Sequence, residues 1–184
     1  MLTPNEQLRR ETELFNAASV AAELEVLASS HSGDQRDLRA ALARRLKSAL
    51  VEGRAVAERL LIRDRQGRRC AERLSFMQDE IIRVLFAFVA KHLYPAQNPS
   101  EAEHMAIVAT GGYGRGVLGA GSDIDLLFLL PYKQTAWGES VAEAILYCLW
   151  DMGLKVGYAT RSVSECIRQA KADMTIRKIG RAHV

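Results

Sequence analysis

The chain has 184 residues, a length that predicts one domain, alone or with a helical extension. Its hydrophobic fraction of 48% is ordinary for a globular protein, and its net charge is +3. This small charge does not by itself indicate a nucleic-acid-binding protein. No apolar run approaches membrane-helix length and no signal peptide opens the chain, so no membrane association is expected. Cys70, Cys148 and Cys166 are odd in number and lack metal-type spacing, which predicts free thiols and a cytoplasmic location.

Residues 1–100 are predicted to form an N-terminal helical region. Apolar residues at helical spacing predict helices over 5–29, 35–65 and 71–93. Gly53 is expected to be a weak point inside the second helix, because glycine disfavours the helical conformation.

The segment 35–69 is strongly basic, with eleven arginine and lysine residues against four acidic ones. The preferred interpretation is a solvated helix face with some ion pairs between residues four positions apart. The alternative is a surface that binds an acidic partner or steers a triphosphate. No aromatic residues alternate with the arginines, so single-stranded nucleic acid is not an expected partner.

A glycine-rich loop between two apolar runs dominates the second half of the chain, a predicted core over residues 101–178. The runs predict strands at 105–110 and 124–130, and six glycines lie between 111 and 121. The second run is apolar at successive positions, which predicts a central strand covered on both faces.

Asp123 and Asp125 are two residues apart, so both should point to the same face of the second strand. Neighbouring carboxylates repel each other unless a cation lies between them, and hard oxygen ligands favour Mg²⁺ or Mn²⁺. Glycines let backbone N–H groups turn toward an anion and let a phosphate approach closely. The segment therefore predicts a nucleoside triphosphate bound together with its metal.

Two other phosphate-binding motifs fit this loop poorly. Residues 114–119 match G-x-G-x-x-G, but a strand follows where a dinucleotide fold needs a helix. Residues 111–116 have the glycine spacing of a P-loop, but Val117 and Leu118 replace its Lys–Ser/Thr pair. What remains is a strand, Gly-Gly, a loop, Ser-Asp-Ile-Asp and a second strand.

This arrangement resembles the nucleotidyltransferase superfamily that includes DNA polymerase beta. Gly-Gly-Tyr-Gly-Arg-Gly at 111–116 and Ser-Asp-Ile-Asp-Leu-Leu at 122–127 are similar to the bacterial PII uridylyltransferase/uridylyl-removing enzymes, as are the segments 149–157 and 160–163. The resemblance implies an α/β fold: a small mixed sheet of a polymerase beta-like domain with an N-terminal helical extension. Its third strand would cover 155–161.

The resemblance also implies a metal-dependent reaction in which UMP passes from UTP to a tyrosine hydroxyl of the PII protein and pyrophosphate leaves. Asp123 and Asp125 would be the catalytic residues and would hold two metals. The nucleotide-binding residues would be Gly111, Gly112, Arg115 and Ser122. For Arg115, a solvent-exposed loop residue without a ligand is the alternative.

Two other functions stay open. One is a different member of the superfamily, such as the adenylyltransferase of glutamine synthetase, although its loop differs from the one here. The other is a non-catalytic interaction module, against which the intact Asp-x-Asp argues. The superfamily often has a further carboxylate on the third strand, where this chain has none; Asp151, Glu165 and Asp173 are candidate replacements.

Three features are predicted near the C-terminus. Residues 139–152 predict a helix that ends with Gly153 at the C′ position, and Ser162 with Glu165 matches a capping box that begins another helix. Residues 179–184 match no continuation of that helix and equal a translated sequencing adapter. We therefore expect a truncated reading frame, an incomplete core and a non-native tail.

Overall fold

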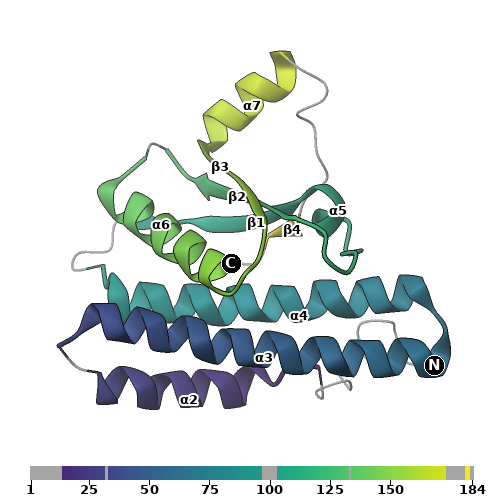
Figure 1. The fold of residues 1–184 in the computed structure, drawn as a ribbon. Helices are drawn as coiled ribbons and strands as arrows, with labels where there is room; N and C mark the ends of the chain where they lie inside the picture. The colour runs from purple at the N-terminus through teal and green to yellow at the C-terminus, as the bar shows by residue number, and fades with distance from the viewer. Residues whose placement is uncertain (1–13, 32, 97–102, 133, 173–180, 183–184) are drawn as a thin grey trace.

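The computed structural model describes residues 14–31, 33–96, 103–132, 134–172 and 181–182, which form a mixed sheet packed against helices (Figure 1). The helices are α2 (Ala17–Ser30), α3 (Gln35–Asp64), α4 (Gly67–Phe88), the π-helix η1 (Val89–Leu93), α5 (Gly111–Gly114), α6 (Ala136–Asp151) and α7 (Val163–Ala172). The strands are β1 (Ala106–Thr110), β2 (Ile124–Leu130), β3 (Val156–Ser162) and the two-residue β4 (Arg181–Ala182). The predicted α/β fold with an N-terminal helical extension is confirmed.

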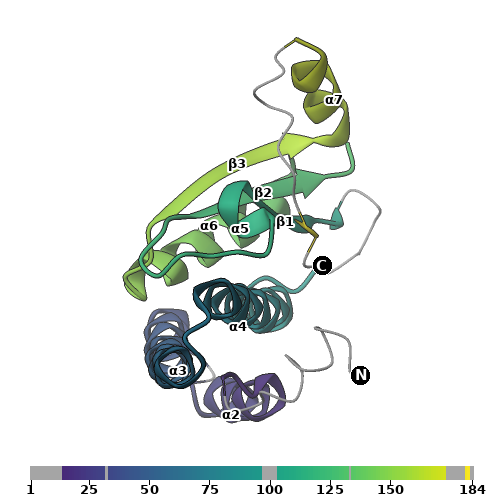
Figure 2. The same ribbon diagram turned by 90° about the vertical axis from the view of Figure 1, so that its right-hand side faces the viewer.

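Helices α2, α3 and α4 form a bundle on one side of the sheet, as Figures 1 and 2 show. Helix α3 begins after Asp34, whose carboxylate accepts hydrogen bonds from two N–H groups of the first turn. It ends at Arg65, which has a left-handed φ of 54°, and α4 begins at Gly67, four residues before its predicted start. The helix predicted over 5–29 is confirmed from residue 17. The prediction was wrong for residues 14–16, because Asn16 caps the start of the helix, and residues 5–13 lie outside the described residues.

Gly53 marks a close crossing in this bundle. A Cβ at this position would overlap the sulfur of Met77 on α4 and the carbonyl oxygen of Leu14. Helix α3 runs unbroken through the glycine that the sequence marked as a weak point. The low helix propensity of glycine is therefore offset by the close approach that its missing side chain permits.

Ion pairs involve part of the basic segment 35–69. Arg45 donates a hydrogen bond of 2.5 Å to Glu23 on α2, and Arg68 pairs with Glu72, four residues further on, at 3.1 Å. The second pair is of the kind that the preferred interpretation expects, whereas the first joins α3 to α2 through a partly buried arginine.

A partly buried ion pair joins the end of α3 to the first turns of α4. Arg73 is fully buried and donates to the Asp64 carboxylate at 2.7 Å, and the same carboxylate accepts the N–H of Gln66 at 3.0 Å. The bond from Gln66, followed by the bond from Arg73, holds the pKa of Asp64 below its ordinary value. The carboxylate thus fastens the turn that separates the two helices.

The strands are arranged in the order β3-β2-β1-β4. Strand β1 is antiparallel to β2 and β4, whereas β2 is parallel to β3 and connects to it through α6. The three predicted strands are confirmed to within one residue at each end. Arg181 and Ala182, in the segment left out of the expected fold, pair with β1 at Ala109 and Val108.

Strand β2 is central in the sheet, as predicted, but only one of its faces is fully buried. Every second residue from Ile124 to Leu130 is at most 2% exposed, and α6 lies on this side, between the sheet and the bundle (Figure 2). The alternate residues Asp125, Leu127 and Leu129 are half-buried. The expectation that both faces are covered was therefore wrong for the described part of the chain, because the crossover helix shields one face.

Both predicted helix boundaries near the C-terminus are confirmed. Gly153 follows α6 with a φ of 84°, and its N–H donates to the Trp150 carbonyl at 2.8 Å. At the start of α7, the Ser162 N–H donates to the Glu165 carboxylate at 2.8 Å and the Glu165 N–H donates to the Ser162 hydroxyl at 3.3 Å. The bonds from Ser162 lower the pKa of Glu165.

Two further observations concern the class of protein. None of the helices in the described ranges has both the length and the apolar character needed to cross a membrane. Cys70, Cys148 and Cys166 are free thiols, as predicted, and burial raises the pKa of Cys148 to about 12. The cytoplasmic location stays a prediction.

Candidate functional site

One edge of the sheet brings together the end of β1 and the starts of β2 and β3. Thr110, Asp125 and Gly157 are register partners across these three strands, so they share a face. This is the half-buried face of β2, away from α6. The glycine-rich loop leaves β1 at this edge and returns to it at β2.

Two glycines leave room for the Asp125 carboxylate. A Cβ at Gly157 would lie 2.5 Å from Oδ1 of Asp125, and a Cβ at Gly111 would overlap Oδ2. Gly111 also has a φ of 63°, a left-handed conformation that residues with side chains rarely adopt. The backbones on both sides thus set the orientation of this carboxylate, and neither position accepts a side chain while that orientation is kept.

Asp123 lies in the loop, one residue before β2, and is exposed. Between the two aspartates, the Ile124 N–H donates to the Lys155 carbonyl at 2.9 Å and fixes the start of the strand. The two carboxylates therefore differ in environment: Asp125 is half-buried between backbones, and Asp123 is open to solvent.

No third carboxylate joins this pair within the described ranges, where no group of three or more His, Cys, Asp or Glu residues could hold a metal. Of the candidate replacements, Glu165 is bonded to Ser162 at the opposite end of β3, and Asp151 is exposed at the end of α6. Asp173 lies outside the described residues. Neither Glu165 nor Asp151 forms such a group with Asp125 in the described part of the chain.

The donor set of two carboxylates fits a hard divalent cation. Mg²⁺ is usually bound through one or two carboxylates together with phosphate oxygens and water, and seldom by a complete cage of protein ligands. The loop beside Asp123 and Asp125 has the backbone freedom to place N–H groups around those phosphates. The site therefore suits a metal that arrives with a phosphorylated ligand.

The first turn of the loop is the short helix α5. Tyr113, in the middle of this helix, is buried, whereas Arg115, which caps the C-terminal end of the helix, is exposed. The Nη2 atom of Arg115 lies 3.7 Å from the position that a Cβ of Gly112 would occupy, so the arginine folds back over the glycine. The structure thus brings together two of the residues predicted to contact phosphate.

The last turn of the loop contains Ser122. Its N–H donates to the Gly119 carbonyl at 3.1 Å, and its hydroxyl oxygen lies 2.6 Å from the position of a Cβ on Gly119. Ser122 is exposed and directly precedes Asp123. A hydroxyl in this turn is accessible to a ligand bound at the two aspartates.

Helix α4 supports the loop from below, which the sequence did not indicate. The Leu118 N–H donates both to the hydroxyl of Ser75, at 2.9 Å, and to the carbonyl of Ala71, at 3.2 Å. Ser75 is 1% exposed. In the sequence, a serine on the apolar face of α4 was the feature that could have indicated this buried hydrogen bond. The role of Gly157 was easier to anticipate, because a glycine inside a strand often marks a close approach.

The family described as "Glutamate-ammonia ligase adenylyltransferase" matches residues 3–149 of this chain. The chain is also similar to curated relatives named bifunctional uridylyltransferase/uridylyl-removing enzyme. The relative from Bradyrhizobium sp. (strain BTAi1) is 63% identical over 176 residues, which cover 96% of this chain and 19% of the relative. The corresponding relative from Rhodopseudomonas palustris is 62% identical over 165 residues, covering 90% and 18%.

A third such relative, from Nitrobacter winogradskyi, is 58% identical over 163 residues, covering 89% of this chain and 18% of the relative. The chain therefore spans about a fifth of the length of the curated relatives it matches. No solved structure matches it.

Proposed function

We propose, on the premise that the chain belongs to the glutamate-ammonia ligase adenylyltransferase family of nucleotidyltransferases, that it transfers UMP from UTP to a tyrosine hydroxyl of the PII regulatory protein and releases pyrophosphate. The observation that carries the nucleotidyl-transfer part is the Asp125 carboxylate held between Gly111 and Gly157 at the end of a glycine-rich loop. The choice of UMP rests on the relatives, which are named uridylyltransferases.

Asp123 and Asp125 would hold Mg²⁺ or Mn²⁺. The bound metal would offset negative charge on the triphosphate and lower the pKa of the attacking hydroxyl. Asp125, fixed by the two glycine backbones, would set the metal position. Asp123 is exposed and would complete the pair from the solvent side, where the triphosphate arrives.

The loop would bind and orient the phosphates. Backbone N–H groups of Gly111 and Gly112 would donate to phosphate oxygens, because no side chain blocks a close approach there. Ser122 would add a hydroxyl donor. Arg115 makes no ion pair with a described residue and folds over Gly112, so its guanidinium is available for a charge-assisted contact with phosphate.

A second candidate is transfer of AMP from ATP to glutamine synthetase. The observation that favours it is the family description, which names an adenylyltransferase. The same aspartates and glycines would serve this reaction, since both transfers proceed at the α-phosphate of a nucleoside triphosphate. The two candidates differ in base and in acceptor protein.

The test is to incubate the chain with Mg²⁺ and each α-labelled nucleoside triphosphate, with PII or with glutamine synthetase as acceptor. We expect label from UTP on a tyrosine of PII, and none with Asp125→Asn. Label from ATP on glutamine synthetase would favour the second candidate. Absence of label on either acceptor from any nucleotide would contradict both.

A further inference from the structure

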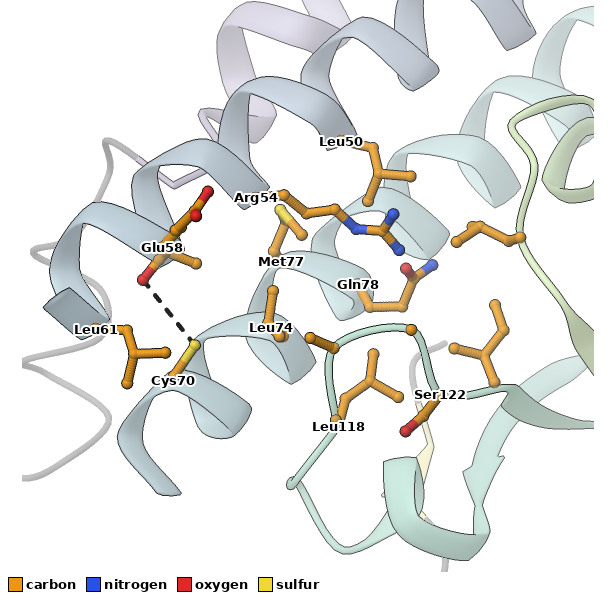
Figure 3. A pocket seen from close by; sticks show the side chains of 16 residues that line it. Leu50, Arg54, Glu58, Leu61, Cys70, Leu74, Met77, Gln78, Leu118 and Ser122 are labelled. Carbon is orange, nitrogen blue, oxygen red and sulfur yellow. Dashed lines mark hydrogen bonds between the residues drawn. The ribbon is translucent and has the colours of Figure 1, made fainter. Parts of the chain in front are cut away.

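A cavity of about 360 Å³ lies behind the loop, between that loop and helices α3 and α4 (Figure 3). Pockets that hold small organic molecules have volumes from roughly 300 to 1,000 Å³. Residues 118–122 form one wall of this cavity. Its apolar lining comes mainly from Leu50, Leu74, Met77, Leu118, Ile124 and Leu154.

Gln78 brings an unsatisfied hydrogen-bond donor to this apolar lining. Its side chain comes from α4 and is 1% exposed. The Nε2 atom is buried and has no hydrogen-bond partner among the described residues. A buried amide that lacks a partner is costly, so an acceptor placed within reach of this donor would stabilise it.

Arg54 brings a positive charge to the same cavity from α3. Its guanidinium makes no hydrogen bond or ion pair with a described residue. In Figure 3 the side chains of Arg54 and Gln78 both extend into the cavity. Arg54 is exposed at the surface of α3, so a ligand could enter along it.

Glu58 is the acidic side chain of the lining. It lies one helical turn beyond Arg54 on α3, but no ion pair joins the two, and its carboxylate points away from the guanidinium in Figure 3. A second negative charge on a ligand would find no cation other than Arg54 among the lining residues, and Glu58 would repel it. The lining thus favours a ligand with a single negative charge.

We propose that this cavity is a binding site for a small monocarboxylate with an apolar body, separate from the nucleotide site. The carboxylate would accept hydrogen bonds from Arg54 and from Nε2 of Gln78, which satisfies the buried donor. The apolar body would lie against the leucines, Met77 and Ile124.

The position of the cavity couples such a ligand to the loop, an extension that rests on the proposed function. The loop is fastened by the Leu118 N–H to α4 and by the Ile124 N–H to Lys155. Gly119, Ala120, Gly121 and Ser122 lie between these points and line the cavity. A molecule packed beneath them would restrict the turn that presents Ser122, and tighter binding of Mg²⁺·UTP follows.

Hexanoate is a suitable probe, with hexan-1-ol as its uncharged match. Titration followed by heteronuclear NMR should show hexanoate binding, with shifts centred on residues 118–122 and on α3 and α4, and much weaker binding of the alcohol. Arg54→Gln should weaken hexanoate binding at least tenfold. Arg59→Gln, at an exposed arginine on the same helix outside the cavity, is the control and should change nothing.

Three results would overturn the site: no hexanoate binding, equal binding of the alcohol, or unchanged affinity in Arg54→Gln. Cys70 lines the cavity, so a second readout is its alkylation rate in a Cys166→Ser background, which hexanoate should slow. Both readouts stand if the chain binds no nucleotide. Mg²⁺·UTP affinity unchanged by saturating hexanoate would refute the effect on the loop alone.

Discussion

Asp125 and Gly157 lie side by side on neighbouring parallel strands, with Oδ1 of the aspartate 2.5 Å from the position that a Cβ of the glycine would occupy. A side chain at residue 157 would therefore have to displace the carboxylate. Gly111, the first residue of α5 directly after β1, imposes the same limit from the other side. The geometry of the candidate metal ligand thus depends on two glycines that have no functional group of their own.

Gly157→Ala should abolish most of the site's ligand binding while leaving the fold intact. The methyl group would push the Asp125 side chain into another rotamer, and a displacement of about 1 Å can lower activity by roughly 100-fold. Without ligand, the variant should melt at nearly the same temperature as the wild type. Mg²⁺·UTP should raise the melting temperature of the wild type but not that of the variant. A variant that keeps the full ligand-induced rise would show that residue 157 does not position Asp125.

Gly53→Ala should destabilise the helical bundle. The added methyl group would overlap Met77 and Leu14, and overpacking of this kind typically costs about 1–3 kcal/mol. Denaturant unfolding measures the loss, with Gly67→Ala as the control, because a Cβ at Gly67 meets no atom within 4 Å. Equal stability of the two variants would mean that α3 and α4 adjust at little cost.

Asp64→Asn should lower stability at neutral pH and have little effect in acid. The folded protein holds the pKa of Asp64 below its ordinary value, so the ionised carboxylate stabilises the fold above that ordinary value, about 4. The stabilisation is lost as the pH falls through the lowered folded-state pKa. Unfolding curves from pH 7 to pH 2 should therefore converge for wild type and variant, and a constant difference would contradict this role.

Elements with a strong local pattern were predictable from the sequence. Helix α3, strand β2 and the capping box at Ser162 follow from periodicity or from short-range hydrogen bonds, and each lies within one residue of its predicted position. The central place of β2 in the sheet was also correct. These features depend on residues that are close together along the chain.

Features that depend on tertiary packing were not predictable. Leu127 and Leu129 are apolar, so β2 looked fully covered, although the described chain shields only its other face. The anchor between Ser75 and Leu118 joins residues 43 positions apart. The cavity between α3, α4 and the loop depends on how these elements pack, which periodicity within each element does not specify.

We propose that Asp123 and Asp125 together hold a divalent metal with UTP, and Mn²⁺ binding tests this pairing directly. The relaxation rate of water protons should rise when Mn²⁺·UTP binds the wild-type chain. Asp125→Asn or Asp123→Asn should weaken that binding at least tenfold. Asp151→Asn, at an exposed aspartate on α6, should bind as tightly as the wild type. Wild-type affinity in Asp125→Asn would contradict the assignment.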